Sequence, residues 1–179
     1  VMSAVVVGMI WTNLLDSAGL VNSVLKALKI ISKPIPFLTD RWGVLFSSMF
    51  VTIWLGLGYY MVIYLTALAN IDESLYEAAS LDGAGPVRQF IYVTMPGVRS
   101  TMMLIMMLST IAAFRVFNEI YVLTNGSAGP GGMDMTMSML IKREGTGIQA
   151  RTGYASAISI VVLVIVGVML IVQQIVQKR

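Results

Sequence analysis

Uninterrupted apolar runs divide this chain into stretches long enough to cross a membrane and polar stretches between them. Residues 42–71 and 152–177 contain no charged side chain. About 20 apolar residues cross the ~30 Å hydrocarbon core of a bilayer, so these runs predict spanning helices at 42–69 and 152–176. A shorter apolar run predicts that residues 1–12 are the end of another span.

Two charges interrupt a third apolar run. Residues Ser100–Phe114 are uncharged, but Arg115 and Glu119 interrupt the run that would otherwise reach Thr124. A lone charge in hydrocarbon is costly, whereas opposite charges four residues apart share one side of a helix and partly neutralise each other. The pattern therefore predicts a third complete span over 98–122, with this ion pair near one membrane face or turned toward a polar path.

The segments that connect the spans differ in character. Within residues 13–41, apolar side chains recur at helical spacing over Leu20–Ile31 and predict a helix lying on the membrane surface. Residues 123–151 are rich in Gly and Met and predict a loop. We expect one all-α transmembrane domain over 1–179, with three complete spans and part of a fourth. The chain starts at Val1 inside an apolar run, so we expect it to lack an N-terminal part of the protein.

The composition excludes most catalytic chemistries. The chain is 57% hydrophobic and 12% charged, with a mean hydropathy of +0.82, whereas a soluble domain is about 25% charged. It has no Cys and no His, which excludes disulfides, thiol and imidazole catalysis, and Cys or His metal sites. A net charge of +3 is too small to indicate a nucleic-acid partner. A phosphate-binding P-loop is also missing, so we expect a membrane protein that is not an enzyme and has no cofactor or metal of its own.

The segment before the third span has the most informative pattern. Ser74 and Glu77 form a capping box, which predicts the start of a helix. Asp82-Gly83 breaks that helix, Gly85-Pro86 starts a second one, and Pro96 limits it. The pattern predicts two short helices set at an angle by a glycine joint. Such a protrusion suits docking into the groove of a partner, and the alternative is an ordinary interfacial loop.

The same segment contains Glu-Ala-Ala, then Asp-Gly-Ala, a Phe and a Pro at fixed distances. It resembles the EAA motif in the membrane subunits of binding-protein-dependent ABC importers, with Met95 where that family usually has Leu. The matching residues are Glu77, Ala78, Ala79, Asp82, Gly83, Ala84, Phe90 and Pro96. The resemblance implies that residues 70–97 are a cytoplasmic coupling loop. Glu77 would then pair with a basic group on an ATPase subunit, Ala78 and Ala79 would allow close packing, and Gly83 would be the joint.

Two further stretches resemble the sugar-importing branch of that family. Residues 117–126, followed by Gly129-Pro130, are similar to its F-D-E-I-Y-V-L-T-x-G-G-P stretch. Trp54-x-Gly56-x-x-Tyr59 resembles the maltose-type permeases. The resemblance implies an ABC importer permease of MetI-like fold with six spans, of which the first two and part of the third are absent.

The partners implied by the resemblance are ATPase subunits that bind ATP and Mg²⁺, a second and different permease chain, and an external solute-binding protein. The implied location is the lipid of a prokaryotic plasma membrane, and the implied mechanism is alternating access driven by ATP. The distribution of basic residues favours the opposite orientation, because the side of the coupling loop has fewer of them. That side has Arg88, Arg99, Lys178 and Arg179, against Lys26, Lys29, Lys33, Arg41, Lys142, Arg143 and Arg151 on the other. We follow the motif, because the charge rule is a bias summed over whole proteins.

A weak sugar site needs an aromatic platform and neutral hydrogen-bonding groups. Thr52, Gly56 and Tyr59 recur at helical spacing and share one face of a helix. The resemblance places this stripe, together with Trp54 on the same span and Ser109 on the next span, on the solute path. The alternative is that these aromatic residues only pack between helices or anchor at the interface. Ala113 stands where maltose-type permeases have Asn, which argues against maltose as the solute.

Two rival functions come from other classes of transporter. Thioethers bind Cu(I), and methionines alternate in the 123–151 loop and line the third span, which suggests a copper channel or carrier. These methionines are Met133, Met135, Met137, Met139, Met102, Met103, Met106 and Met107. The other explanation for them is gap filling between helices. An ion-coupled carrier is the second rival, but the spans 42–69 and 152–176 have no ionisable residue with which to couple a proton or sodium ion.

Overall fold

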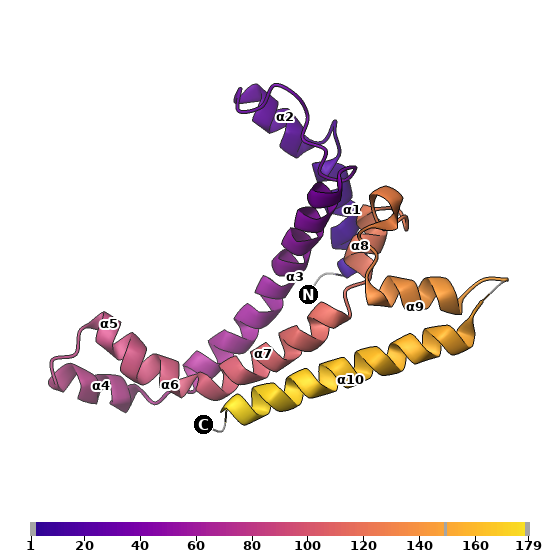
Figure 1. The fold of residues 1–179 in the computed structure, drawn as a ribbon. Coiled ribbons are helices and arrows are strands. Elements are labelled where there is room, and N and C mark those ends of the chain that lie inside the picture. Colours follow the sequence, from indigo (N-terminus) through magenta and orange to yellow (C-terminus); the bar gives the residue numbers. More distant parts are fainter. Residues whose placement is uncertain (1–2, 149, 178–179) are drawn as a thin grey trace.

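A computed structural model describes residues 3–148 and 150–177, and every regular element in these ranges is helical. The prediction of an all-α fold is therefore confirmed (Figure 1). The elements in chain order are α1 (Ala4–Leu15), α2 (Leu20–Ala27), α3 (Arg41–Ala69), α4 (Glu73–Leu81), α5 (Pro86–Gln89), a π-helical turn η1 (Phe90–Thr94), α6 (Met95–Gly97), α7 (Arg99–Phe114), α8 (Asn118–Leu123), a 3₁₀ turn η2 (Pro130–Gly132), α9 (Met137–Gly145) and α10 (Thr152–Gln177).

Three helical stretches are long and apolar enough to cross a membrane: Ala4–Ala27, which contains α1 and α2, Arg41–Ala69 and Thr152–Val176. A fourth, Pro86–Phe114, qualifies only as a helix pair bent by 64° between Gly97 and Arg99. Figure 1 shows α3 running from the α2 end of the molecule to the α4–α5 end, where α7 begins and near which α10 ends. With about 1.5 Å of rise per residue, the 29 residues of α3 extend about 43 Å.

The expected single span over 98–122 is two helices. α7 ends at Phe114, Arg115 caps it, and α8 starts only at Asn118. The reason is tertiary, because α8 packs across α1 and α3 and buries Leu123 against Val7 and Val51. The expected ion pair between Arg115 and Glu119 does not form, and both ion pairs recorded among the described residues involve Glu144 instead.

The segment before α3 is held together by one buried polar side chain. Asn22 on α2 is fully buried, and its Nδ2 donates to the carbonyl oxygens of Asp16 and Ile35, both at 3.1 Å. Its Oδ1 accepts from the Ile35 amide at 2.8 Å. The helix expected over 20–31 ends earlier, at Ala27, because Lys29 adopts φ +56° and turns the chain back.

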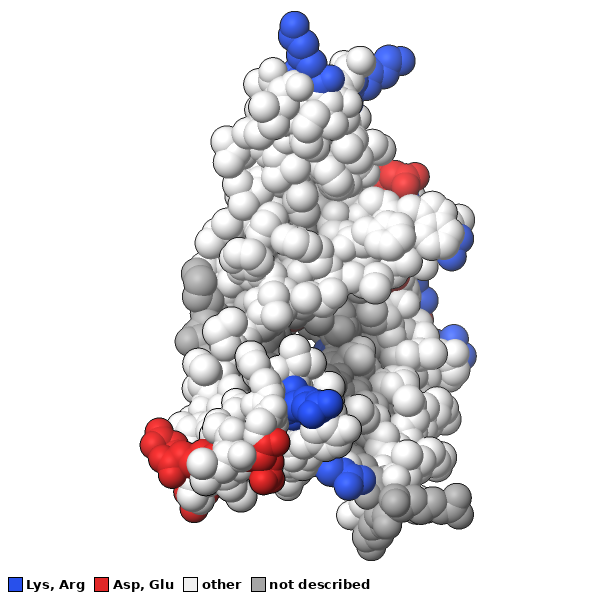
Figure 2. All heavy atoms as spheres, turned by 90° about the vertical axis from the view of Figure 1, so that its left-hand side faces the viewer, with Lys and Arg blue, Asp and Glu red and all other residues white. Residues whose placement is uncertain are grey.

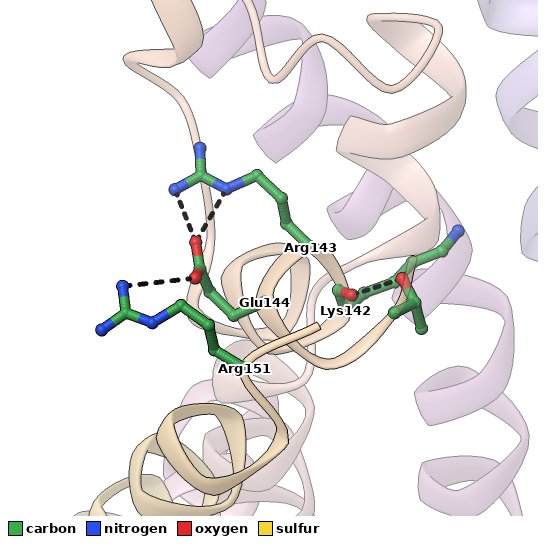
Figure 3. A network of polar contacts seen from close by, with 5 residues as sticks. Lys142, Arg143, Glu144 and Arg151 are labelled. Carbon is green, nitrogen blue, oxygen red and sulfur yellow. Dashed lines mark hydrogen bonds and ion pairs between the residues drawn. The ribbon is translucent and has the colours of Figure 1, made fainter. Parts of the chain in front are cut away.

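The segment 123–151, which the sequence predicts as a loop, contains the helix α9. Thr136 caps α9, because its hydroxyl accepts from the Met139 amide at 3.3 Å. The ammonium group of Lys142 lies 3.9 Å from the ring centre of Tyr121. Glu144 bridges Arg143 at 3.2 Å and Arg151 at 4.0 Å, which ties α9 to the start of α10 (Figure 3). The glycines of the segment 123–151 therefore do not prevent α9 from forming, and cation–π and ionic contacts hold this helix in place.

Candidate functional site

The candidate site is the protrusion of α4, α5 and η1 between α3 and α7. Helix α4 starts at Glu73, and its cap is Asp72, whose carboxylate accepts from the Ser74 amide at 3.0 Å. This hydrogen bond lowers the pKa of Asp72. The expected capping box of Ser74 and Glu77 is therefore wrong by two residues, because the Asp72 carboxylate provides the capping acceptor two residues earlier.

The turn between α4 and α5 has the hydrogen bonds of a Schellman motif. The Gly83 amide donates to the Ser80 carbonyl at 3.0 Å, and the Ala84 amide donates to the Ala79 carbonyl at 2.9 Å. Asp82 is the C-cap of α4, and this motif requires the residue after the cap to be left-handed. Gly83 has φ +74°, and its surroundings are open. The predicted break at Asp82-Gly83 is confirmed, and backbone conformation rather than space explains the glycine.

The second half of the protrusion contains a wide helical turn. Gly85 caps α5, with Pro86 as its first residue, as predicted. The chain then passes through the π-helical turn η1, in which the Met95 amide bonds to the Phe90 carbonyl five residues back. The sequence predicts that Pro96 limits this helix, but the helix continues through Pro96 to Gly97. A π turn changes the register of the carbonyl groups, which accommodates a residue that has no amide hydrogen.

The outer surface of the protrusion is acidic and apolar at once. Glu77 and Ala78 are exposed and Ala79 is half-buried. Leu81 and Val87 are 90% and 72% exposed, unusually high for large apolar side chains in an ordered turn region. Four exposed carboxylates belong to the same segment: Asp72, Glu73, Glu77 and Asp82. Figure 2 shows most of the visible Asp and Glu side chains gathered at the lower end of the molecule, with some basic groups beside them and further basic groups at the upper end and along one edge. This surface is suited to a partner with basic and apolar groups.

The predicted substrate-path residues on α3 divide between two sides of the helix. Thr52, Gly56 and Tyr59 share one face, but Trp54 lies two residues after Thr52 and projects about 200° away from it. Trp54 instead packs edge-on against Trp11 of α1, with 5.6 Å between ring centres. The structure therefore does not bring Trp54 and Tyr59 together on one platform. Tyr59 packs edge-on against Tyr60, 5.3 Å away.

The two small polar residues of the predicted path are bonded within their own helices. The Thr52 hydroxyl donates to the Ser48 carbonyl at 2.8 Å, and the Ser109 hydroxyl donates to the Met106 carbonyl at 3.0 Å. Such bonds satisfy a hydroxyl in an apolar surrounding while leaving its oxygen free to accept another bond. These oxygens could accept a hydrogen bond from a solute hydroxyl.

The methionines do not converge on one point. Met139 is buried with Ile120 and Ala128, and Met135 packs against the same cluster. Met133 and Met137 are 65% and 53% exposed. Because α9 begins at Met137, Met137 and Met139 point about 200° apart. On α7, Met103 and Met107 line an open groove of about 350 Å³. This arrangement does not favour the copper hypothesis.

Asp134, which sequence reasoning missed, is a buried carboxylate in the segment between α8 and α9. It is 9% exposed, and its Oδ2 has no hydrogen-bond partner among the described residues. Burial raises the pKa of Asp134, and Asp40 adds to the increase while Arg41 opposes it. Its alternation with methionines and its position after four nearby glycines gave no sequence signal of burial.

We predict that Asp134→Asn raises the melting temperature of the protein at pH 7. A raised pKa means that the folded state disfavours the charged carboxylate. The charge therefore destabilises the fold once the pH rises above the pKa that Asp134 has in the unfolded chain, and this cost vanishes in acid. The expected gain is a few degrees, since about 1 kcal/mol shifts the melting temperature by about 2–4 °C at this size. Thermal unfolding of the detergent-solubilised protein at pH 7 and pH 4 measures it. A gain that is equal at both pH values would contradict the explanation.

A family model described as the binding-protein-dependent transport system inner membrane component matches residues 1–179. The chain belongs to this family. The lactose transport system permease protein LacF of Rhizobium radiobacter is 32% identical over 169 residues, which cover 94% of this permease chain and 57% of that protein. The diacetylchitobiose uptake system permease protein NgcF of Streptomyces coelicolor is 32% identical over 164 residues, covering 90% and 46%. The permease thus spans about half the length of these curated relatives.

A solved structure also matches the permease over nearly its whole length. The crystal structure of a bacterial ABC transporter involved in the import of the acidic polysaccharide alginate superposes with a TM-score of 0.85. The two chains are 25% identical, and the match covers 99% of the permease and 61% of that chain. The predicted permease fold is therefore confirmed, and the family and its named relatives are transport proteins of the membrane.

Proposed function

We propose that this chain is the membrane-spanning part of an ATP-driven importer for a sugar or oligosaccharide, and that residues 70–97 couple it to ATPase subunits. The observation that carries the proposal is the two-helix protrusion of α4 and α5, which leaves Leu81 and Val87 exposed at one end of the spans. A membrane helix leaves apolar side chains exposed to lipid, but an acidic, hydrogen-bonded protrusion beyond the spans needs a protein partner to cover it. Family membership supports an ATPase as that partner.

The chemistry of the protrusion suits a cleft lined by basic and apolar groups. Glu77 is exposed and would pair with a cation of the ATPase subunit, and Ala78 beside it allows the two backbones to approach. Asp82 and Gly83 set the angle at which α5 leaves α4. Closure of two ATPase subunits on ATP would move this unit and switch the spans between inward and outward access.

The proposed solute is a sugar or oligosaccharide, because the named relatives carry lactose and diacetylchitobiose. Its path would run along Thr52, Gly56 and Tyr59 of α3 and Ser109 of α7, and Trp54 would serve packing against α1. The proposed setting is a prokaryotic plasma membrane that the chain crosses several times. A second permease chain and an external solute-binding protein would complete the importer, and ATP and Mg²⁺ would bind to the ATPase subunits alone.

The experiment that tests the coupling role uses the absence of Cys from the chain. A single Ala78→Cys is placed in the full-length protein, in cells that also make its ATPase subunit with one Cys in the candidate cleft. We expect an oxidant to form a disulfide between the two, and we expect Ala78→Cys to resist a membrane-impermeant maleimide in intact cells. Met133→Cys, exposed at the other end of the molecule, is the matched control and should react.

The opposite outcome is equally clear. Reaction of Ala78→Cys with the external maleimide, without a cross-link, would place the protrusion outside the cell and would reject the coupling role. A cross-link would also decide the orientation against the count of basic residues on the two sides of the membrane.

A further inference from the structure

The glycine turn at the tip of the protrusion does not by itself hold α4 and α5 together. A Cβ at Gly83 or Gly85 would meet no atom within 4 Å, so the tip has no packing of its own. Two side-chain bridges cross the gap behind the turn. The Gln89 Nε2 donates to the Ser80 hydroxyl at 2.8 Å and to the Ala84 carbonyl at 3.2 Å. The hydroxyls of Tyr76 and Thr94 share a hydrogen bond of 2.8 Å at the base.

The bridge between Tyr76 and Thr94 is the one that leads into the next span. Tyr76 is half-buried on α4, and Thr94 is the last residue of η1. The Thr94 carbonyl accepts from the Val98 amide at 3.0 Å, and the Val98 carbonyl accepts from the Met102 amide of α7 at 2.9 Å. Val98 is 6% exposed, so this corner is fixed by packing as well. A continuous series of hydrogen bonds therefore joins α4 to α7 without passing through Gly83.

The corner at the base of the protrusion is also closely packed. A Cβ at Gly97 would lie 2.9 Å from Cδ1 of Ile71, so α6 lies directly against a residue just beyond the end of α3. α4 itself packs against α5 and η1. The main contacts of α4 are thus with elements on the α7 side of the protrusion. Toward α3 it shares an open pocket with Leu68 and Ala69, and residues 70–72 link it covalently to α3.

We propose that Tyr76 is a positioning residue that passes movement of α4 to α7 through its hydrogen bond with Thr94. The inference rests on the proposed coupling function and adds to it the route of transmission. The α4–α5–η1 unit moves as one body because its two side-chain bridges close the hairpin. The movement enters α7 at the π turn, and the glycine joint sets the shape of the unit without acting as its hinge.

The test measures movement of α7 directly, so that it does not depend on the identity of the solute. A cysteine replaces Ser100, which is exposed at the start of α7, in the full-length transporter assembled with its ATPase subunits. The readout is the change in its rate of reaction with a maleimide when ATP is added. We expect Tyr76→Phe and Thr94→Val each to reduce this change about fivefold, the size expected for one lost hydrogen bond, while Thr94→Ser retains it. The double variant should be no worse than either single variant.

Tyr92→Phe is the matched control, because Tyr92 is in the same π turn but 74% exposed. It should leave the ATP-dependent change unaltered. The Ala78→Cys cross-link, formed in each background, shows whether the ATPase still docks. A normal cross-link with an unaltered change in Tyr76→Phe would overturn the inference, as would equal losses in Tyr92→Phe and Tyr76→Phe.

Failure of the proposed function would look different. In that case the parent with Tyr76 intact would show neither the cross-link nor any change on ATP addition. If Tyr76→Phe does not assemble, Thr94→Val and Thr94→Ser decide the question, because both leave the aromatic ring in place. An equal loss in these two variants would reject the hydroxyl bridge.

Discussion

Replacing Gly83 by Pro is expected to abolish transport while leaving membrane insertion intact. Gly83 has φ +74°, which the proline ring cannot adopt, and its amide donates to the Ser80 carbonyl at 3.0 Å. The substitution therefore removes one hydrogen bond of the Schellman motif and forces the chain out of the left-handed turn. Strain of about 1–3 kcal/mol at one residue is enough to redirect α5 away from α4. Uptake in cells that express the full-length protein measures the loss.

A matched pair of milder variants separates backbone conformation from side-chain space. A Cβ at Gly83 and a Cβ at Gly85 would both meet open space, but Gly85 has φ −71°. Gly83→Ala should therefore reduce uptake and the Ala78→Cys cross-link, and Gly85→Ala should change neither. Normal uptake by Gly83→Pro would show that the angle between α4 and α5 is not needed for coupling.

The second large effect is expected from Asn22→Ala, which removes the side chain that joins α2 to the segment before α3. The Ile35 amide loses its one recorded partner. The carbonyls of Asp16 and Ile35 each lose one of two donors and keep the amides of Gly19 and Phe37, respectively. A backbone amide left unpaired costs about 1–3 kcal/mol and each of the two other lost hydrogen bonds about 0.5–1.5 kcal/mol, so the loss is a few kcal/mol and confined to this segment. Hydrogen exchange followed by mass spectrometry should show fast exchange at Ile35, with α3 and α10 unaffected.

Asn13→Ala is the control for that experiment. Asn13 is exposed, and its Nδ2 donates only to the Met9 carbonyl within the same helix, at 2.8 Å. This variant should exchange like the parent protein. Slow exchange at Ile35 in Asn22→Ala would mean that the segment is held by other contacts, such as the hydrogen bond that the Ser47 hydroxyl donates to the Phe37 carbonyl.

Local signals predicted the protrusion well because its geometry is mostly local. The break at Gly83 and the start at Pro86 follow from backbone preferences of Gly and Pro that no distant contact overrides. The cap was misplaced because Asp72 and Ser74 are both good caps, and only the hydrogen bond to the Ser74 amide distinguishes them. The position of Trp54 opposite Thr52 and Tyr59 follows from helical geometry alone, because two residues turn a helix by about 200°.

The sequence by itself determined where the helices α3 and α10 lie, because charge-free runs of that length have one stable arrangement in hydrocarbon. It also determined the family, through residues at fixed spacing in the segments 74–96 and 117–130. Only the tertiary structure decided that the helix after Arg99 stops at Phe114, that Asn22 and Asp134 are buried, and that Tyr76 meets Thr94. These features depend on contacts between side chains far apart in the chain, whose free energy outweighs local preference and leaves no periodic pattern in the sequence.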